Sequence, residues 1–582
     1  MKPRTAGPRH LFTLNLDRLL TRFPLSLIAL IVPGALLAQA PRPELPLKHD
    51  PRPTVPAITA ADLMTRLYIF ADDSMMGREA GTPGNIMGTE YIARELKRLG
   101  LKPAGDNGTY YQDFPLESTK PDPATRVAVG EAVLTMGKDY LMFPAIGLPQ
   151  IGAGFDAENV AVIYGGKIGD AALVSPDAAA GKLVLFAPAD GPAGWQFWQR
   201  FGPAQYQKYS TSKGLILASL EVLPPFLTGM LSEEQVGKAG ESGPAPTVPL
   251  MFVSRAAAEM LMGGPLTGLM AGTPGKSATA KGGFLKGPAA VPARNVVAIV
   301  PGTDPALRGQ YVAIGGHNDH VGMQRPAVDH DSLRAFNGVV RPGGAEDMGK
   351  QPTPAQLDTV RLVLDSLRKI HTPRADSVMN GADDDGSGSM AVLELAEYFV
   401  KNPAKRSLLF VWHTGEEKGL WGSEYFTDHP TVARDSIITQ LNIDMIGRGD
   451  VDDLKNGGPG ALGLLGSRRL STQLGDLVEE VNLKGKHGFT FDYQFDANGH
   501  PQQYYCRSDH YEYARYGIPI VFFSTGDHRD YHMATDEPQY IDYDKYARVA
   551  ELIMDLGRTL ANLEQRVVVD KPKPDPNGRC VQ

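Results

Sequence analysis

The sequence contains only two cysteines, Cys506 and Cys580, among its 582 residues. At most one disulfide can form, so a hydrophobic core and not a disulfide framework must stabilise the fold. The sequence also lacks an excess of positive charge, since its formal net charge is −8 at pH 7. This balance argues against nucleic acid as a partner. Whether the two cysteines pair stays open at this point.

A membrane-spanning stretch is lacking near the N-terminus. Residues 1–40 begin with basic side chains, continue with an apolar run over 23–37 and end in Ala-Gln-Ala. This pattern is typical of a secretory signal peptide cleaved after Ala40, and the alternative is an uncleaved anchor. Because Pro33 interrupts a run already shorter than the ~20 residues of a spanning helix, cleavage is favoured. We therefore expect an exported protein, periplasmic or extracellular, without an integral membrane span after cleavage.

The composition changes several times along the chain and predicts more than one folded module. Short apolar, β-branched runs separated by Gly, Pro and Asp indicate a small β-rich domain inserted into a larger catalytic one. The predicted segments are a signal peptide at 1–40, a Pro-rich linker at 41–57, catalytic segments at 58–139 and 288–565, the inserted domain at 140–287, a helical insertion at about 323–379 and a tail at 566–582.

Strand-like and helix-like patterns alternate in the catalytic segments. Continuous apolar runs predict buried strands at 407–414, 438–447 and 518–524, with helices at 388–400 and 470–481 between them. Such alternation predicts an α/β fold in which helices sandwich a mostly parallel mixed sheet. Ligands bind at the carboxyl ends of strands in these folds, and the candidate residues fall there.

Two common hydrolase motifs are missing. The sequence has neither an HExxH helix nor a GxSxG elbow, which excludes the zincin and the α/β-hydrolase serine mechanisms. It offers instead histidines and carboxylates at several strand ends. These are the side chains with which a metal hydrolase binds its ions and takes a proton from water.

The first candidates lie at a strand end and in an acidic turn. His317 closes an apolar strand, and Asp319 is placed to accept a hydrogen bond from its far ring nitrogen. The turn GADDDGSG puts three carboxylates before a helix, with Asp384 in the centre. A helix cap or a calcium loop are alternatives, but the alternating oxygen ligands of an EF-hand are absent. We interpret Asp384 as a ligand that bridges two cations.

Further carboxylates follow other apolar strands. Glu416 and Glu417 are adjacent, so their side chains point different ways, and one can bind a metal while the other acts as a base. Asp444 ends another apolar run, where an unpaired buried carboxylate costs several kcal/mol, so a cation is expected. From the residues alone, the remaining histidine ligand stays open among His510, His528 and His532.

The ordered motifs resemble peptidase clan MH, the co-catalytic zinc aminopeptidases with the glutamate carboxypeptidases and glutaminyl cyclases. They are His-x-Asp after a strand, G-A-x-D-x-G-S-G, Glu-Glu before G-L-x-G-S, N-x-D-M-x-G and a late Tyr-His. The resemblance implies two zinc ions per chain. It assigns His317 and Asp444 to one ion, Glu417 and His532 to the other, and Asp384 to both.

The resemblance also implies roles around the metals. Glu416 is expected to be the general base, Tyr531 to donate a hydrogen bond to the oxyanion, and His510 to belong to the wall of the substrate pocket. The strands inserted before residue 288 resemble a protease-associated domain. The expected activity is that of a secreted aminopeptidase acting on the N-termini of peptides or proteins. A carboxypeptidase, a glutaminyl cyclase and a non-catalytic receptor-like module remain alternatives.

One feature departs from the family pattern. Family members have the first His and the bridging Asp close in sequence, whereas Asp384 follows His317 by 67 residues here. The intervening segment includes an amphipathic helix and is predicted to pack beside the cleft. The apolar face of that helix carries Leu357, Val360, Leu364 and Leu367.

Overall fold

A mixed sheet forms the centre of the catalytic region, in the strand order β1-β14-β18-β15-β19-β22-β20-β21, with β2 on β14. Its inner strands β18, β15, β19 and β22 are parallel neighbours, while β14 and β20 join them antiparallel. The predicted mostly parallel sheet is therefore parallel at its centre and antiparallel toward its edges. The strand bounds are β1 Lys102–Pro103, β2 Tyr111–Phe114, β14 Ala293–Val300, β15 Tyr311–His317, β18 Ser407–His413, β19 Ile437–Ile443, β20 Ala461–Leu465, β21 Thr490–Asp492 and β22 Ile520–Ser524.

The computed structural model describes residues 45–143, 153–170, 172–188, 203–223, 225–240, 248–449, 451, 453–454 and 457–582. The predicted signal peptide and the first residues of the linker lie outside this set. Within it, no helix combines the length and the apolar character that crossing a bilayer requires.

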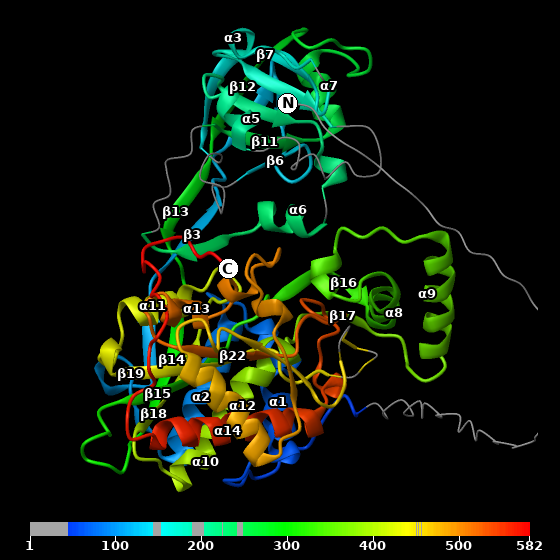
Figure 1. Cartoon of the computed structure of the whole chain (residues 1–582). Helices are drawn as coiled ribbons and strands as arrows, with labels where there is room; N and C mark the ends of the chain where they lie inside the picture. The colour runs from blue at the N-terminus through cyan, green and yellow to red at the C-terminus, as the bar shows by residue number, and fades with distance from the viewer. Residues whose placement is uncertain are drawn as a thin grey trace, which may run out of the picture. The chain divides into compact units, whose positions relative to one another are not determined.

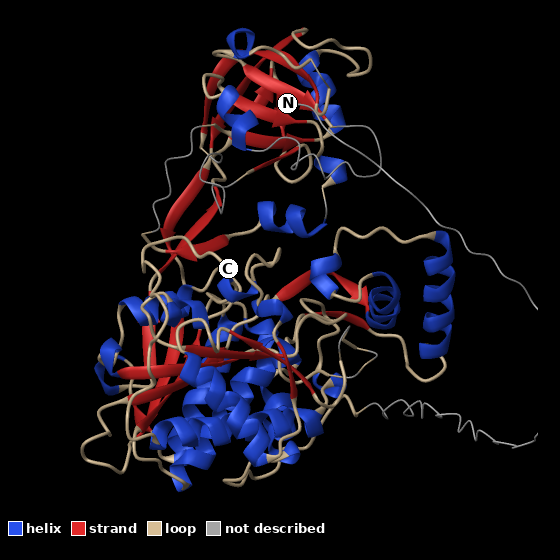
Figure 2. Ribbon diagram, viewed as in Figure 1, coloured by secondary structure: helices blue, strands red, loops and turns tan. Residues whose placement is uncertain are grey.

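Helices cover both faces of the central sheet, as predicted (Figures 1 and 2). One apolar cluster joins the sheet to α1, α2, α10, α12 and α14, and another joins its opposite face to α11 and α13. The strand residues are buried on both sides, which explains their continuous apolar character. The helix bounds are α1 Ala60–Phe70, α2 Pro83–Leu99, α10 Gly388–Lys401, α11 Trp421–Asp428, α12 Thr472–Gly485, α13 His510–Ala514 and α14 Tyr543–Asn562.

Local signals fix the ends of several helices. The Thr59 side chain caps α1 by accepting a hydrogen bond from the N–H of Asp62. Helix α2 ends at Gly100, whose φ of 79° is left-handed and therefore favours glycine.

The β-rich region has its own eight-stranded sheet among the described residues, in the order β5-β4-β12-β7-β8-β9-β11-β6. It begins at Arg126, earlier than the predicted start at 140, because β4 and β5 are too short to stand out as strands in the sequence. The bounds are β4 Arg126–Val129, β5 Ala132–Leu134, β6 Tyr140–Met142, β7 Phe155–Lys167, β8 Leu183–Ala187, β9 Gly214–Leu217, β11 Leu250–Val253, β12 Pro274–Gly282, α3 Pro176–Ala179, α5 Pro203–Lys208, α6 Pro225–Ser232 and α7 Arg255–Met262.

Two smaller sheets complete the described strands. In one of them, β3 (Leu116–Pro121) lies between β10 (Gln235–Lys238) and β13 (Phe284–Pro288). In the other, β16 (Met323–Asp329) pairs antiparallel with β17 (Ala375–Val378). This second pair begins and ends the insertion that was predicted at about 323–379.

The insertion contains two helices, α8 (His330–Val340) and α9 (Pro354–Leu367). The amphipathic helix predicted from the sequence is α9, but none of its described residues is fully buried. Leu357 remains 36% exposed, so the apolar face of α9 is only partly covered. Glu346, in the turn between these helices, accepts a hydrogen bond from Arg507, which lies outside the insertion.

Candidate metal centre

The parallel central strands bring the predicted ligands to one edge of the sheet. His317 is the last residue of β15, and Asp444 directly follows β19. Glu416 and Glu417 follow the end of β18, which lies beside β15. Asp384 comes from the turn that precedes α10, and His532 from the loop after β22. Carboxyl ends of parallel neighbours meet at the same edge, which is why five distant segments converge.

The ligand atoms form two groups that meet at Asp384. Its Oδ1 lies 3.2 Å from Nε2 of His317, whose same nitrogen is 3.7 Å from Oδ1 of Asp444. Its Oδ2 lies 2.9 Å from Nε2 of His532, which is also 2.9 Å from Oε2 of Glu417. One carboxylate thus directs one oxygen to each group, which is the arrangement needed of a ligand that bridges two cations.

The donor atoms fit divalent metal ions. Buried atoms without a hydrogen-bond partner in the described part of the chain include His317 Nε2, Asp384 Oδ2, Glu417 Oε1 and His532 Nε2. Leaving such atoms unsatisfied costs free energy, so their convergence indicates an ion. Imidazole nitrogens and carboxylate oxygens are the ligands that zinc accepts. The residues present can therefore hold two such ions.

His320 belongs to the same neighbourhood and was not anticipated. Its Nδ1 lies 2.8 Å from Oε1 of Glu417 and 3.7 Å from Oδ2 of Asp384. The signal was available, because the strand ends in His-Asn-Asp-His and His320 is only three residues after His317. Sequence reasoning passed over it because the family motif covers only the first histidine and the aspartate.

Asp319 supports the site, though differently from the prediction. Nδ1 of His317 lies 3.1 Å from the main-chain oxygen of Asp319 but 3.8 Å from its carboxylate, beyond hydrogen-bond range. The Asp319 carboxylate instead accepts a hydrogen bond from the N–H of Glu416. The expected orientation of the His317 ring therefore comes from a backbone carbonyl, while the carboxylate positions the Glu416 segment.

Carboxylates next to Asp384 hold its turn in place. Asp385 accepts hydrogen bonds from the N–H groups of His317 and Gly388. Asp383 lies 3.2 Å from His528, which was one of the three histidines left open by the sequence. His528 therefore contacts the turn behind the ligands and not the two ligand groups themselves.

The electrostatics of the ligand carboxylates reflect their histidine neighbours. Burial raises the pKa of Asp384, but His317 and His532 outweigh it and hold that pKa well below its ordinary value. Burial and Asp384 raise the pKa of Glu417, while His532 and His320 bring it down to about 2. Both side chains are therefore carboxylates near neutral pH, the form that binds a cation.

Glu416 and Tyr531 differ from Asp384 and Glu417 in the direction of their pKa shifts. Burial raises the pKa of Glu416 well above its ordinary value, with His317 opposing and Glu417 adding to the shift. A nearby cation acts in the opposite direction, because it favours the carboxylate. Burial also raises the pKa of Tyr531, so its hydroxyl stays protonated and can donate a hydrogen bond.

A cavity opens on the carboxylates of Asp384, Glu416, Glu417 and Asp444. Its apolar lining consists of Met445, Leu465, Phe495 and Phe522, and its polar lining includes Tyr504, Arg507, Asp527 and Tyr531. His510 is fully buried and stacks on Phe522 with ring centroids 4.7 Å apart, behind the lining. The structure thus brings Tyr531 to the cavity, whereas His510 is separated from it by one aromatic ring.

A third group of buried His, Asp and Glu residues lies in the described region, formed by His330, Asp376 and Glu537. Arg374 already bonds both of these carboxylates. A cation there would compete with the guanidinium, so the group is an ion-pair network that attaches the insertion to the loop beyond His532.

Residues 295–557, which contain every predicted ligand, match the model of peptidase family M28. The chain is 27% identical over 219 residues to leucine aminopeptidase 1 of Sclerotinia sclerotiorum, covering 36% of this chain and 51% of that protein. It is 28% identical over 234 residues to a probable zinc metalloprotease of Pyricularia oryzae, covering 33% and 46%. The chain therefore spans about half the length of these curated relatives.

A solved structure of a zinc aminopeptidase from Bacillus subtilis aligns with 90% of this chain and 100% of its own, at 16% identity and a TM-score of 0.48. The family match coincides with the segment in which strand ends and the Asp384 turn converge. Residues 295–557 of the chain are therefore similar to peptidase family M28 over the segment that contains the candidate ligands.

Proposed function

We propose that the protein is a zinc-dependent exopeptidase that removes N-terminal residues from peptides or proteins. The observation that carries the proposal is the bridging position of Asp384, with one oxygen toward His317 and the other toward His532. The family match and relatives described as leucine aminopeptidase and zinc metalloprotease support the same reaction class.

The proposed ligand assignment follows the two groups at the site. His317 and Asp444 would hold one zinc ion, Glu417 and His532 the other, and Asp384 both. When bound, the two ions supply Lewis acidity toward the scissile carbonyl and toward water. This chemistry needs one nearby carboxylate that stays free of the metals.

Glu416 is proposed as that carboxylate. Its Oε2 lies 4.0 Å from Nε2 of His317, and it lines the cavity beside the ligands. The carboxylate accepts a proton from the attacking water and returns one to the leaving amine. The Tyr531 hydroxyl, also on the cavity wall, donates a hydrogen bond to the oxyanion that develops on the carbonyl oxygen.

The test is a Glu416→Gln variant assayed for both metal and turnover. We expect zinc near two per chain by elemental analysis and a loss of about 10²- to 10⁴-fold in kcat, the usual contribution of general acid–base catalysis. Glu480→Gln, on the exposed side of α12, is the matched control. Full activity of the Glu416 variant would refute its assignment as base.

A substrate panel tests the exopeptidase direction separately. Peptides with a free amino terminus are expected to be cleaved one residue at a time, and N-acetylated versions to resist. Equal hydrolysis of both would refute the aminopeptidase assignment, and release from the carboxyl end would favour a carboxypeptidase. A chelator should abolish cleavage, and added zinc should restore it.

We also propose that the protein is exported and that the β-rich region is a protease-associated domain. The Cys506–Cys580 disulfide supports export, because such bonds persist in oxidising compartments. The signal-like composition of residues 1–40 supports it as well. Mass spectrometry of protein from the periplasm or medium should find a chain that begins at residue 41; one retaining residues 1–40 would refute cleavage.

A further inference from the structure

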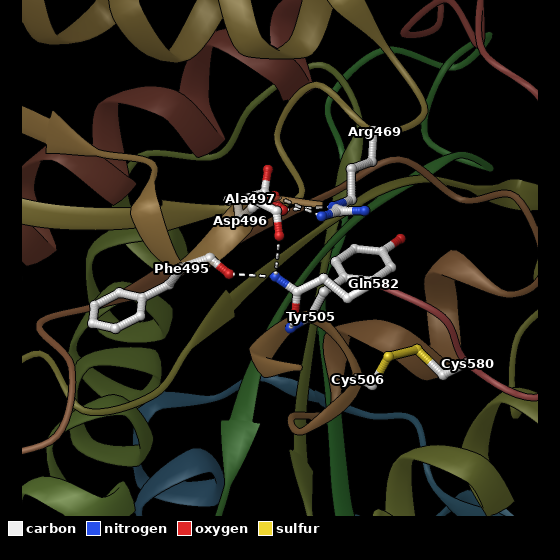
Figure 3. The surroundings of a disulfide bond; sticks show 8 residues. All are labelled: Arg469, Phe495, Asp496, Ala497, Tyr505, Cys506, Cys580 and Gln582. Carbon is white, nitrogen blue, oxygen red and sulfur yellow. Dashed lines mark hydrogen bonds and ion pairs between the residues drawn. A yellow bond between two sulfur atoms is a disulfide. The ribbon is translucent and has the colours of Figure 1, made fainter. Parts of the chain in front are cut away.

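The segment Arg579–Gln582 packs against the catalytic domain although neither the family match nor the proposed reaction uses it. Gln582 is only 9% exposed. Its side-chain Nε2 donates to the main-chain oxygens of Phe495 and Ala497, at 2.5 and 3.0 Å, and its Oε1 accepts from the N–H of Tyr505 at 3.0 Å. Figure 3 shows the Gln582 side chain beside Phe495, Ala497 and Tyr505.

The main chain of Gln582 adds a further bond. Its carbonyl oxygen accepts a hydrogen bond of 2.8 Å from the N–H of Gly499. Donor and acceptor atoms of one residue are thus paired with a segment 77 to 87 residues earlier in the sequence. A buried side chain that satisfies both of its amide atoms in this way is fixed in position.

The segment held by Gln582 supplies a wall of the substrate cavity. Phe495, Tyr504 and Arg507 all line the cavity that opens on the ligand carboxylates. Within 494–508, the regular structure consists only of short 3-10 turns, at Gln494–Asp496 and Tyr504–Cys506. Without strand or helix partners, the shape of this wall depends on tertiary contacts.

A covalent bond ties the tail to the same wall. Cys580 forms a disulfide with Cys506, the residue that immediately precedes Arg507, across a separation of 74 residues. Figure 3 shows the disulfide beside the Gln582 amide. The tail is therefore attached both by the hydrogen bonds of Gln582 and by the disulfide at Cys506, so it cannot leave the wall by breaking hydrogen bonds alone.

Arg469 holds the wall from another direction. Its Nε donates to Asp496 at 2.5 Å, and its guanidinium lies 4.3 Å from the centre of the Tyr505 ring. These contacts restrain Asp496 and Tyr505 but leave Phe495, Ala497 and Gly499 to the bonds with Gln582. The tail thus provides contacts that Arg469 does not replace.

We propose that Cys580 and Gln582 are positioning residues of the substrate pocket. They act through Phe495, Tyr504 and Arg507, which touch the substrate, and not on the metals. The proposed zinc ligands and Glu416 come from other segments of the chain. We therefore expect the tail to affect the affinity for substrate and not the chemical steps. The inference rests on the proposed peptidase function, because that function defines the pocket's occupant.

The experiment compares Gln582→Ala with Val581→Ala, whose side chain is 79% exposed one residue away. We expect KM for an aminoacyl substrate to rise about 3- to 10-fold in the Gln582 variant, from the loss of two or three hydrogen bonds, with kcat within about twofold. Zinc content should stay equal. Gln582→Glu turns a carboxylate toward the carbonyl oxygens of Phe495 and Ala497, so it should raise KM at least as much as Gln582→Ala.

Hydrogen exchange supplies a readout that needs no activity. The amide of Tyr505 donates to the Gln582 side chain, so it should exchange faster in Gln582→Ala than in Val581→Ala. The amides of Gly499 and Tyr505 should both exchange faster in a Cys506→Ser, Cys580→Ser double variant, because the tail is then held by hydrogen bonds alone. Unchanged exchange together with an unchanged KM would overturn the proposal. A fall in kcat and zinc content in parallel, with KM unchanged, would also overturn it in favour of general destabilisation. A wild-type chain that hydrolyses no peptide would refute the proposed function alone, because the exchange comparison still tests the wall.

Discussion

The carboxylate of Asp536 accepts a hydrogen bond of 3.2 Å from the main-chain N–H of Asp384. It accepts a second one, of 3.0 Å, from the N–H of Asp383. Asp384, the proposed bridging ligand, is therefore held from behind by a residue that lies four positions after His532, another proposed ligand. Outer partners of this kind set the orientation of ligands and so the affinity for metal.

Replacement of Asp536 by Asn should weaken zinc binding. The neutral amide oxygen of Asn is a weaker acceptor than the carboxylate that takes both backbone N–H groups, so the Asp384 turn loses part of its support. We expect an affinity about 10- to 100-fold lower by chelator competition, with the fold retained by circular dichroism. Asp544→Asn, exposed in the first turn of α14, is the control; equal affinities in the two variants would contradict the role of Asp536.

His320 is predicted to support Glu417 rather than to bind zinc. A site made of His320, Asp384, Glu417 and His532 would have four protein ligands, and catalytic zinc keeps a position open. His320→Ala should therefore keep two zinc ions per chain at saturating metal, with affinity reduced about 10- to 100-fold. His532→Ala should lose one ion. A stoichiometry of one in His320→Ala would instead make His320 a ligand.

Glu346 is predicted to tune substrate binding from the insertion. It accepts a hydrogen bond of 2.7 Å from Arg507, which lines the cavity and also lies 3.4 Å from the Tyr531 hydroxyl. Both partners are partly exposed, so solvent weakens the pair, and Glu346→Gln should raise KM by about two- to fivefold with little change in kcat. Steady-state kinetics measures this change in KM, with Asp365→Asn on exposed α9 as the control. Identical KM values in the two variants would show that the insertion does not affect substrate binding.

Glu512 should make stability depend on pH. Burial, aided by Glu424 and Asp428 and opposed by Arg515, raises its pKa to about 7. The folded protein then binds more protons than the unfolded chain between about pH 4.5 and 7, so this group's contribution to stability falls as pH rises through that interval.

Glu512→Gln removes that titration. The variant should match wild type in thermal midpoint near pH 4.5 and exceed it at pH 8, where the wild-type carboxylate is charged and buried. Calorimetric scans at several pH values would measure the difference. A midpoint difference that does not change with pH would show that the pKa of Glu512 is not raised in the folded protein.

Local patterns were sufficient for much of the fold and for placing the main candidate ligands at strand ends. The strands ending near His413 and Ile443 and the helix that begins at Gly388 carry strong apolar periodicity, so the carboxylates beside them could be placed. The hydrogen-bond partner of the His317 ring could not be predicted, because the ring lies against the main-chain oxygen of Asp319 and not against its carboxylate.

Long-range contacts were beyond the reach of the sequence. Glu346 meets Arg507 across 161 residues, and Gln582 meets Tyr505 across 77. Neither contact belongs to a repeating sequence pattern. The segments that make these contacts are irregular, so only tertiary packing determines where they lie. The same reason explains why the partial exposure of α9 was not foreseen from its apolar face.

The strand pair β16 and β17 has a consequence for how this domain can change. Met323 pairs with Val378, and the N–H of Met379 bonds the oxygen of Gly322, so the two ends of the insertion meet at its base. Chain length between His317 and Asp384 can therefore vary without moving either residue. Residues 323–378 can be exchanged as one unit at this hairpin base, provided that the replacement keeps the bonds of Arg374 to Glu537 and of Ala345 to Tyr531.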